Sequence, residues 1–258
     1  MRAWLRLLGL ALLLGSVPRP PAAEDVHAIV QRWTDASRRN FDAAQRYSYV
    51  ETIRNDDGAK TYVVTMLVGC PYRRLVQGDG HSLEDEQNEA LEQARQKRAR
   101  ESPDERQRRL TEYQKNRKRA QGVLEELPRA FDYALQSTRQ LDWRTLYVLT
   151  ATPRRGYDPP NDDARVLTGM QGEFWIDAKT YQLVHGRASV LHPVPIDGFL
   201  ATVEPGTQFE IDQRPVDDGI WLPAHVSIQS RSSIVFVFHH RMSEDRTYFN
   251  YHKPASDP

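Results

Sequence analysis

The run GEFWIDAKTYQLV, residues 172–184, decides the fold class because it contains two short strands separated by a tight polar turn. Side chains alternate between the two faces of a strand, so Phe174 and Ile176 share one face, while Trp175 and Glu173 share the other. Two strands joined by so short a turn pair antiparallel. Bulky apolar residues on both faces of one strand indicate a sheet that needs cover on both sides.

Strand-like runs of the same kind lie on either side of this hairpin. They occupy residues 48–78, 143–153 and the chain from about 199 to 253, and the turn signals DDG, AKT, EPGT, VDDG and SED separate them. Two runs are apolar on both faces: TYVVTMLV, with Tyr62, Val64, Met66 and Val68 opposite Val63 and Leu67, and SIVFVF, with Ile234, Phe236 and Phe238 opposite Val235 and Val237. Helices do not alternate with these strands, so the sequence predicts an α+β fold that is mainly antiparallel β.

Residues 25–46 have the periodicity of an amphipathic helix. Apolar side chains recur three or four positions apart and form one face: Val26, Ile29, Val30, Trp33, Ala36 and Phe41. A helix of this kind can cover one side of the sheet.

Residues 83–135 form a charged segment with almost no β-branched residues, and this composition predicts helix. Within it Ser102, Pro103 and Glu105 have the spacing of a capping box, so two helices are expected. The apolar end of the segment, VLEELPRAFDYAL, is expected to pack as helix up to about Leu135. Acids flank the basic run KNRKR at 115–119, which indicates a solvated helix face, and the apolar heptads of a coiled coil are missing.

The N-terminus has the pattern of a secretory signal peptide. Arg2 and Arg6 precede an apolar run at 7–17 that is too short to span about 30 Å of hydrocarbon. We expect cleavage after Ala23, which leaves residues 24–258 as a single domain with 83–135 as a charged helical insertion, in the periplasm or secreted. An anchored N-terminal helix is the alternative. No other run is apolar and long enough to cross a membrane, so stable membrane insertion is not expected.

Charge and cysteine content exclude several classes of protein. The chain carries 35 basic and 35 acidic residues, which gives no global field that would attract nucleic acid. Cys70 is the single cysteine, so an intramolecular disulfide is excluded. It lies in LVGC, a sequence that resembles a bacterial lipoprotein acylation site, but this run lies far from the N-terminus and is strand-like. We therefore expect Cys70 to carry no acyl chain.

Catalytic motifs are absent from the sequence: no nucleophile elbow, phosphate-binding loop, dinucleotide fingerprint or HExxH is present. His239 and His240 are adjacent and would face opposite sides of a strand, and His185 and His192 have no third ligand nearby in the sequence. The sequence therefore predicts no catalytic residues, no metal site, no cofactor and no enzyme.

Apolar surface that the helices leave uncovered would form a cavity for an apolar ligand. The alternative is a filled core, because aromatic side chains at strand spacing are more often core than cavity.

Several motifs together resemble those of exported bacterial proteins. These are YxYxET at 47–52, GEFWIDxxTxxLV at 172–184, PGTxFE at 205–210, DGIWLP at 218–223 and YFNYHK at 248–253. They are similar to the outer-membrane lipoprotein-sorting proteins, the LolA/LolB-like class, over roughly residues 25–80 and 140–253. The resemblance implies a strongly curved, unclosed β-barrel with helices on its concave side around an acyl-chain cavity.

The resemblance implies a non-enzymatic periplasmic binder or carrier of lipid or lipoprotein acyl chains. The residues that we expect to line its cavity are Trp33, Phe174, Ile176, Phe236 and Phe238. Regulators of the RseB type share the fold, so the alternative is a protein-interaction or envelope-stress sensor module that contacts an envelope protein through residues 84–126.

Overall fold

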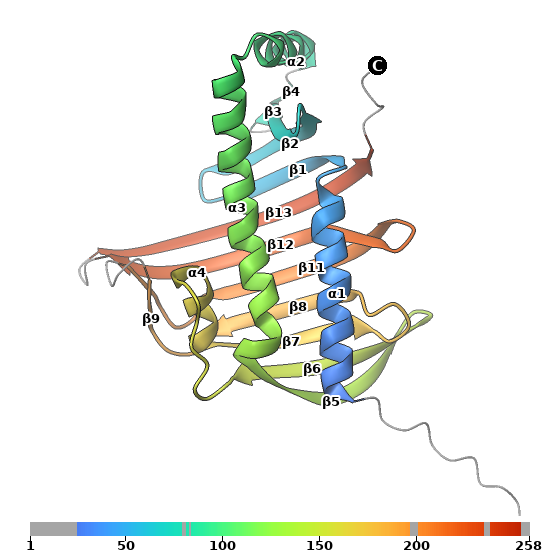
Figure 1. The fold of residues 1–258 in the computed structure, drawn as a ribbon, viewed down its shortest axis with the longest axis vertical. Coiled ribbons are helices and arrows are strands. Elements are labelled where there is room, and N and C mark those ends of the chain that lie inside the picture. The colour runs from blue at the N-terminus through green and yellow to red at the C-terminus, as the bar shows by residue number, and fades with distance from the viewer. Residues whose placement is uncertain (1–24, 79–80, 83, 197–200, 235–237, 254–258) are drawn as a thin grey trace, which may run out of the picture.

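The computed structural model of the chain describes residues 25–78, 81–82, 84–196, 201–234 and 238–253. Its strands form one antiparallel sheet in the order β4-β3-β2-β1-β13-β12-β11-β8-β7-β6-β5, with β10 paired to β12 and β9 paired to β10. The strands at the two ends of this order, β4 and β5, do not pair with each other, so the sheet is open. Figure 1 shows the curved sheet with the helices α1 and α3 crossing one side of it. The predicted fold class, α+β with a curved and unclosed antiparallel sheet, is confirmed.

The strands follow most of the predicted runs. Their bounds are β1 Ser48–Asn55, β2 Gly58–Leu67, β3 Cys70–Gly78, β4 His81–Ser82, β5 Phe131–Leu141, β6 Arg144–Pro153, β7 Met170–Asp177, β8 Leu183–Val190, β9 Val194–Ile196, β10 Ala201–Val203, β11 Gln208–Asp217, β12 Ile220–Ile234 and β13 Phe238–His252. The first strand, β1, lies between β2 and the last strand, β13.

The hairpin predicted at 172–184 is formed by β7 and β8, which pair with Trp175 opposite His185. Asp177 shapes its turn, because one carboxylate oxygen accepts hydrogen bonds from the backbone amides of Lys179 at 3.0 Å and Thr180 at 2.8 Å. This turn chemistry explains why the chain reverses at the predicted position.

The helices follow the predicted runs, and α3 begins at the predicted cap. Helix α1, Val26–Ala44, starts after Asp25, whose side chain accepts a hydrogen bond from the amide of His27. Helix α2, Glu84–Ala99, is followed by α3, Pro103–Ala130, and the capping box at Ser102 is present as predicted. The short elements α4 and η1, Asp162–Arg165 and Val166–Gly169, precede β7.

The end of α3 corrects the sequence prediction. The helix stops at Ala130, whereas the sequence led us to expect helix up to about Leu135. Residues from Phe131 onward form β5, in which Phe131, Tyr133 and Leu135 alternate with more exposed positions. Pairing with β6 and burial of these alternate side chains outweigh helix propensity here.

Two further strand predictions are wrong. Ile234 and Phe238 were expected on one face of a single strand, but they are register partners on the neighbouring strands β12 and β13. The run between them has no Gly, Pro, Asn or Asp to mark a reversal. The SED sequence at 243–245, predicted as a turn, lies inside β13, where backbone pairing with both β1 and β12 overrides its turn composition.

Both long helices lie on the same side of the sheet (Figure 1), so the expectation of cover on both faces is not met by helices. Side chains of the outer face cover its apolar residues instead. The ring of Trp175 contacts the His185 ring at a centroid distance of 5.1 Å, and the guanidinium of Arg139 lies 5.2 Å from the Trp175 ring centroid. A polar outer face can therefore hold a tryptophan without a second layer.

The core lies between the helices and the concave face and has two main clusters. Under α1, side chains that are fully buried or nearly so pack together: Ile29, Val30, Trp33, Leu149, Ile176 and Leu183. Toward the end of α3 the second cluster contains Ala130, Phe131, Ala151, Ala164, Leu167, Met170, Val190 and Val194. The boundary between the two clusters is where the candidate site lies.

The predicted signal peptide at 1–23 lies outside the described residues. Across the ranges that the structure describes, the search for a helix long and apolar enough to span a membrane finds none.

Candidate functional site

An apolar cavity of about 220 Å³ lies between the end of α3 and the concave face of the sheet. Leu127 of α3, Phe131 and Leu167 border it on the helix side. Inward-facing residues of four neighbouring strands form its opposite wall: Phe174, Gly186, Ala188, Phe209, Ile211, Val226 and Ile228. Its walls expose only apolar surface, so they can bind a hydrocarbon and present no acid, base or nucleophile to a substrate.

Apolar side chains at every second position of β11 and β12 form the floor of this cavity. Phe209 pairs with Ile228, and Ile211 pairs with Val226, so four apolar side chains meet on the concave face. All four are only partly buried, in contrast to Ile176, which is fully buried beneath α1. The sheet is therefore filled under α1 and hollow beside the end of α3.

Two glycines make room for the ring of Phe174 against the sheet. A Cβ atom at Gly172 would lie 2.9 Å from this ring, and a Cβ at Gly186 would lie 3.2 Å from it and 3.3 Å from Ile211. Any larger residue would push the ring away from the sheet and into the cavity. The glycines thus set the depth of the cavity.

The five residues predicted to line an acyl-chain site have different positions. Phe174 lines the cavity. Trp33 and Ile176, which are 2% and 0% exposed, belong to the packed cluster beside it. Phe236 lies outside the described residues, and the side chain of Phe238 is not described either. Sequence reasoning did not identify the floor on β11 and β12, although the motif PGTxFE contains Phe209.

The Trp33 indole separates the filled part of the core from the hollow part. Its ring lies 4.7 Å from the ring of Phe174 and 6.2 Å from that of Tyr133, measured between centroids. The indole nitrogen is buried and has no hydrogen-bond partner among the residues that the structure describes. Burial also raises the pKa of Tyr133, whose hydroxyl donates to the backbone oxygen of Leu127 and so ties β5 to α3.

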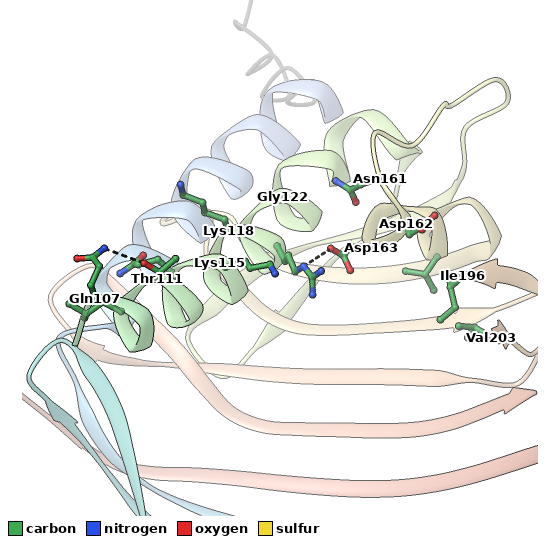
Figure 2. A pocket seen from close by; sticks show the side chains of 14 residues that line it. Gln107, Thr111, Lys115, Lys118, Gly122, Asn161, Asp162, Asp163, Ile196 and Val203 are labelled. Carbon is green, nitrogen blue, oxygen red and sulfur yellow. Dashed lines mark hydrogen bonds and ion pairs between the residues drawn. The ribbon is translucent and has the colours of Figure 1, made fainter. Parts of the chain in front are cut away.

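A wider groove of about 1360 Å³ lies along α3 (Figure 2). On α3, Gly122 lines the groove and Leu127, about one and a half helical turns later, lines the cavity. In the same way Val166 lines the groove and the next residue, Leu167, lines the cavity. A Cβ atom at Gly122 would meet no atom within 4 Å, so this side of the helix is open. The groove and the cavity are therefore lined by neighbouring parts of α3 and η1.

The groove is polar on its helix side and apolar on part of its far side. Lys115, Lys118 and Arg119 of α3 line it, and the guanidinium of Arg119 lies 3.7 Å from the Asp163 carboxylate of α4. Val166, Ile196 and Val203 supply apolar surface across from them, as Figure 2 shows for the last two. The groove can thus accept a molecule with both apolar and anionic parts.

Comparisons with known proteins give similarity to solved structures alone. No protein-family model matches the chain, and no characterised protein matches it significantly in sequence. A LolA superfamily protein from Nitrosomonas europaea is 11% identical, with 92% of this chain and 96% of that chain covered and a TM-score of 0.34. A putative outer-membrane lipoprotein-sorting protein domain from Vibrio parahaemolyticus is 8% identical, with 89% and 95% covered and a TM-score of 0.36.

The MucA/MucB complex of Pseudomonas aeruginosa contains a chain that is 12% identical, with 84% of this chain and 93% of that chain covered and a TM-score of 0.22. Identities this low assign no activity. The TM-scores, all below 0.5, likewise assign the chain to no family.

Proposed function

We propose that the protein is a periplasmic binder or carrier of lipid or lipoprotein acyl chains and that it acts without catalysis. The observation that carries this proposal is the cavity beside the end of α3, which is hollow and whose walls expose only apolar surface. Its position on the concave side of an open sheet agrees with the site that the sequence resemblance implies. The cavity is formed by apolar side chains of four strands and does not depend on a single residue.

The cavity has room for part of an acyl chain. Its volume of about 220 Å³ exceeds the roughly 150 Å³ at which a dry apolar cavity takes up benzene. Each buried methylene contributes about 0.8 kcal/mol, so six of them give about 5 kcal/mol before the cost of ordering the chain. This energy corresponds to roughly submillimolar affinity. Tighter binding requires contacts in the adjoining groove, where Ile196 and Val203 continue the apolar surface.

A pair of variants on one strand tests this function. Val226→Phe places a ring in the cavity, whereas Ser227→Phe adds the same ring on the opposite face of β12. Fluorescent fatty acid binding should fall at least tenfold in Val226→Phe and stay within twofold of wild type in Ser227→Phe. Circular dichroism and urea denaturation check that both variants fold.

Native mass spectrometry of detergent-free protein gives an independent measurement. Copurified lipid should be present in the wild type and in Ser227→Phe and depleted in Val226→Phe. If the folded wild type takes up no fatty acid, or if both variants bind equally well, the acyl-chain function is wrong.

The alternative is a protein-interaction or envelope-stress sensor module, and the feature that supports it is the charged helical segment. Helix α2 and the first half of α3 extend past the sheet beside β3 and β4 (Figure 1), and cationic side chains such as Arg95 and Lys97 are exposed there. Photo-crosslinking from the exposed position 96 in intact cells would detect a partner. Reversing the charge of Arg95 and Lys97 should then abolish the crosslink and leave fatty acid binding unchanged, because neither residue borders the cavity.

A further inference from the structure

A row of metal-ligating side chains crosses the outer face of the sheet, behind the cavity. His185 of β8 pairs in register with Asp212 of β11, and Asp212 pairs in register with His225 of β12. Glu210 lies two residues before Asp212 and so shares its face, since side chains of one face recur every second position. Strand β8 and the β11–β12 hairpin thus place two imidazoles and two carboxylates side by side.

The donor atoms of His185, Glu210 and Asp212 lie within 4.8 Å of one another, and His185 Nδ1 shares a hydrogen bond with Asp212. The Nδ1 atom of His185 lies 2.8 Å from Asp212 Oδ1 and 3.9 Å from Glu210 Oε1. The Nδ1 atom of His225 lies 3.4 Å from Asp212 Oδ2. Zinc bonds to imidazole nitrogen and carboxylate oxygen are about 2.0–2.2 Å long, so donors at the corners of a tetrahedron lie roughly 3.3–3.6 Å apart. The observed separations lie on both sides of that value.

Neighbouring side chains hold the two imidazoles in place. Asp245 of β13 lies 2.6 Å from Nε2 of His225, which leaves Nδ1 of that ring directed at Asp212. A carboxylate on the far nitrogen of a metal-binding histidine fixes the tautomer and orients the ring. The ring of Trp175 packs edge-on against His185 with centroids 5.1 Å apart. Both rings are thus oriented by groups outside the row.

The local charge also suits a cation. Arg187 stands opposite Glu210 in the pairing of β8 with β11, but its guanidinium lies 3.2 Å from Glu173. The carboxylates of Glu210, Asp212 and Asp245 therefore dominate the row. Imidazole combined with carboxylate ligands favours transition metals over magnesium or calcium, which prefer oxygen alone.

We infer that His185, Glu210, Asp212 and His225 form a zinc site on the outer face of the sheet, with Asp245 as the partner that orients His225. The sequence predicted no metal site because the four ligands come from three strands and have no recognisable spacing. The ion would connect β8, β11 and β12 directly behind the cavity, since Glu210 and Asp212 alternate along β11 with the cavity residues Phe209 and Ile211.

Isothermal titration of the tag-free, EDTA-treated full-length protein with Zn²⁺ tests the site. Wild type should bind one ion per chain. His185→Gln and Asp212→Asn should each weaken binding at least tenfold, and Asp245→Asn should weaken it about 10-fold to 100-fold through the lost orientation of His225. His192→Gln is the matched control, because His192 is exposed and lies outside the row, and it should bind like wild type.

Thermal unfolding supplies a second readout that requires no lipid. Saturating Zn²⁺ should raise the Tm of wild type and of His192→Gln, since a ligand that binds only the folded state stabilises it. The same concentration should raise the Tm of His185→Gln and Asp212→Asn by less, because the stabilisation falls as the dissociation constant rises. The inference is overturned if the wild type shows no saturable binding below about 1 mM Zn²⁺, or if folded His185→Gln and Asp212→Asn bind as tightly as wild type.

Discussion

The rings of Trp33 and Phe174 pack against each other with centroids 4.7 Å apart and an interplanar angle of 39°. This contact joins α1 to β7 at the point where the filled core meets the cavity, because Trp33 is 2% exposed and Phe174 lines the hollow. The Phe174 ring therefore packs against Trp33 on one side and faces the cavity, where a ligand can contact it, on another.

Trp33→Ala should destabilise the protein strongly, because it empties a site in the packed cluster under α1. We expect the free energy of unfolding in urea to fall by about 3–5 kcal/mol, the usual cost of removing a buried aromatic ring. Trp33→Phe should lose less than half of this, since it keeps a ring in place. A loss below about 1 kcal/mol for Trp33→Ala would contradict the packing described for α1.

Gly186→Ala should reduce fatty acid binding more than its small size suggests. The added Cβ would lie 3.2 Å from Phe174 and 3.3 Å from Ile211, so the ring must move into the cavity. Overpacking of this kind costs about 1–3 kcal/mol of stability. Gly122→Ala is the matched control. It lies within α3, where an added Cβ meets no atom, so it should gain about 1 kcal/mol in stability where Gly186→Ala loses it.

Glu51 of the YxYxET motif should be important for the stability of the sheet. It is 3% exposed, and its carboxylate lies 2.8 Å from Arg73 of β3 and 3.4 Å from Arg246 of β13, so it links β1 to strands on both sides of it in the sheet. Glu51→Ala leaves the two guanidinium groups without this partner and should cost about 3 kcal/mol in urea denaturation. Arg54→Ala, an exposed change on the same strand, should stay within about 0.5 kcal/mol of wild type.

The junction between α2 and α3 should loosen in acid. Hydrogen bonds from Arg109 lower the pKa of Glu101 from its ordinary value of 4.5 to about 2, and Arg98 contributes as well. A lowered folded-state pKa means that the stabilisation is complete above about pH 4.5 and is lost as the pH falls toward 2. An NMR titration of the Glu101 carboxyl should show a midpoint well below 4. A midpoint near 4.5 would contradict the ion pairs at this junction.

Glu101→Gln provides the control for this pH dependence. The variant cannot ionise at position 101, so the signals of Arg98 and Arg109 should not change between pH 5 and pH 2.5 through this contact. The same signals should shift in wild type as Glu101 takes up its proton.

Local patterns predicted most of the fold. The hairpin at 172–184, the capped start of α3 and the amphipathic α1 each follow from spacing within a few residues. The errors lie where strand pairing between distant residues decides the structure. At Phe131, pairing with β6 makes a strand where helix was predicted. At Ile234 the chain reverses although no turn residue marks the reversal.

The candidate site was harder to predict because its walls come from separate strands. Phe174 was identified from the two-faced strand in which it lies, but the partners Phe209 and Val226 were not. The zinc ligands were missed for the same reason, since His185 and Asp212 become neighbours only through the register of β8 with β11.

The position of β1 beside β13 makes assembly of the sheet depend on its last strand in sequence. The meander of β1 to β4 joins the other strands only through β13, whose residues 238–252 leave the ribosome after all the rest of the sheet. Pairings this distant in sequence form slowly, because the long loop between them must close first. A nascent chain therefore keeps one edge of β1 unpaired until β13 has been made, and a chain truncated before β13 keeps that edge unpaired throughout.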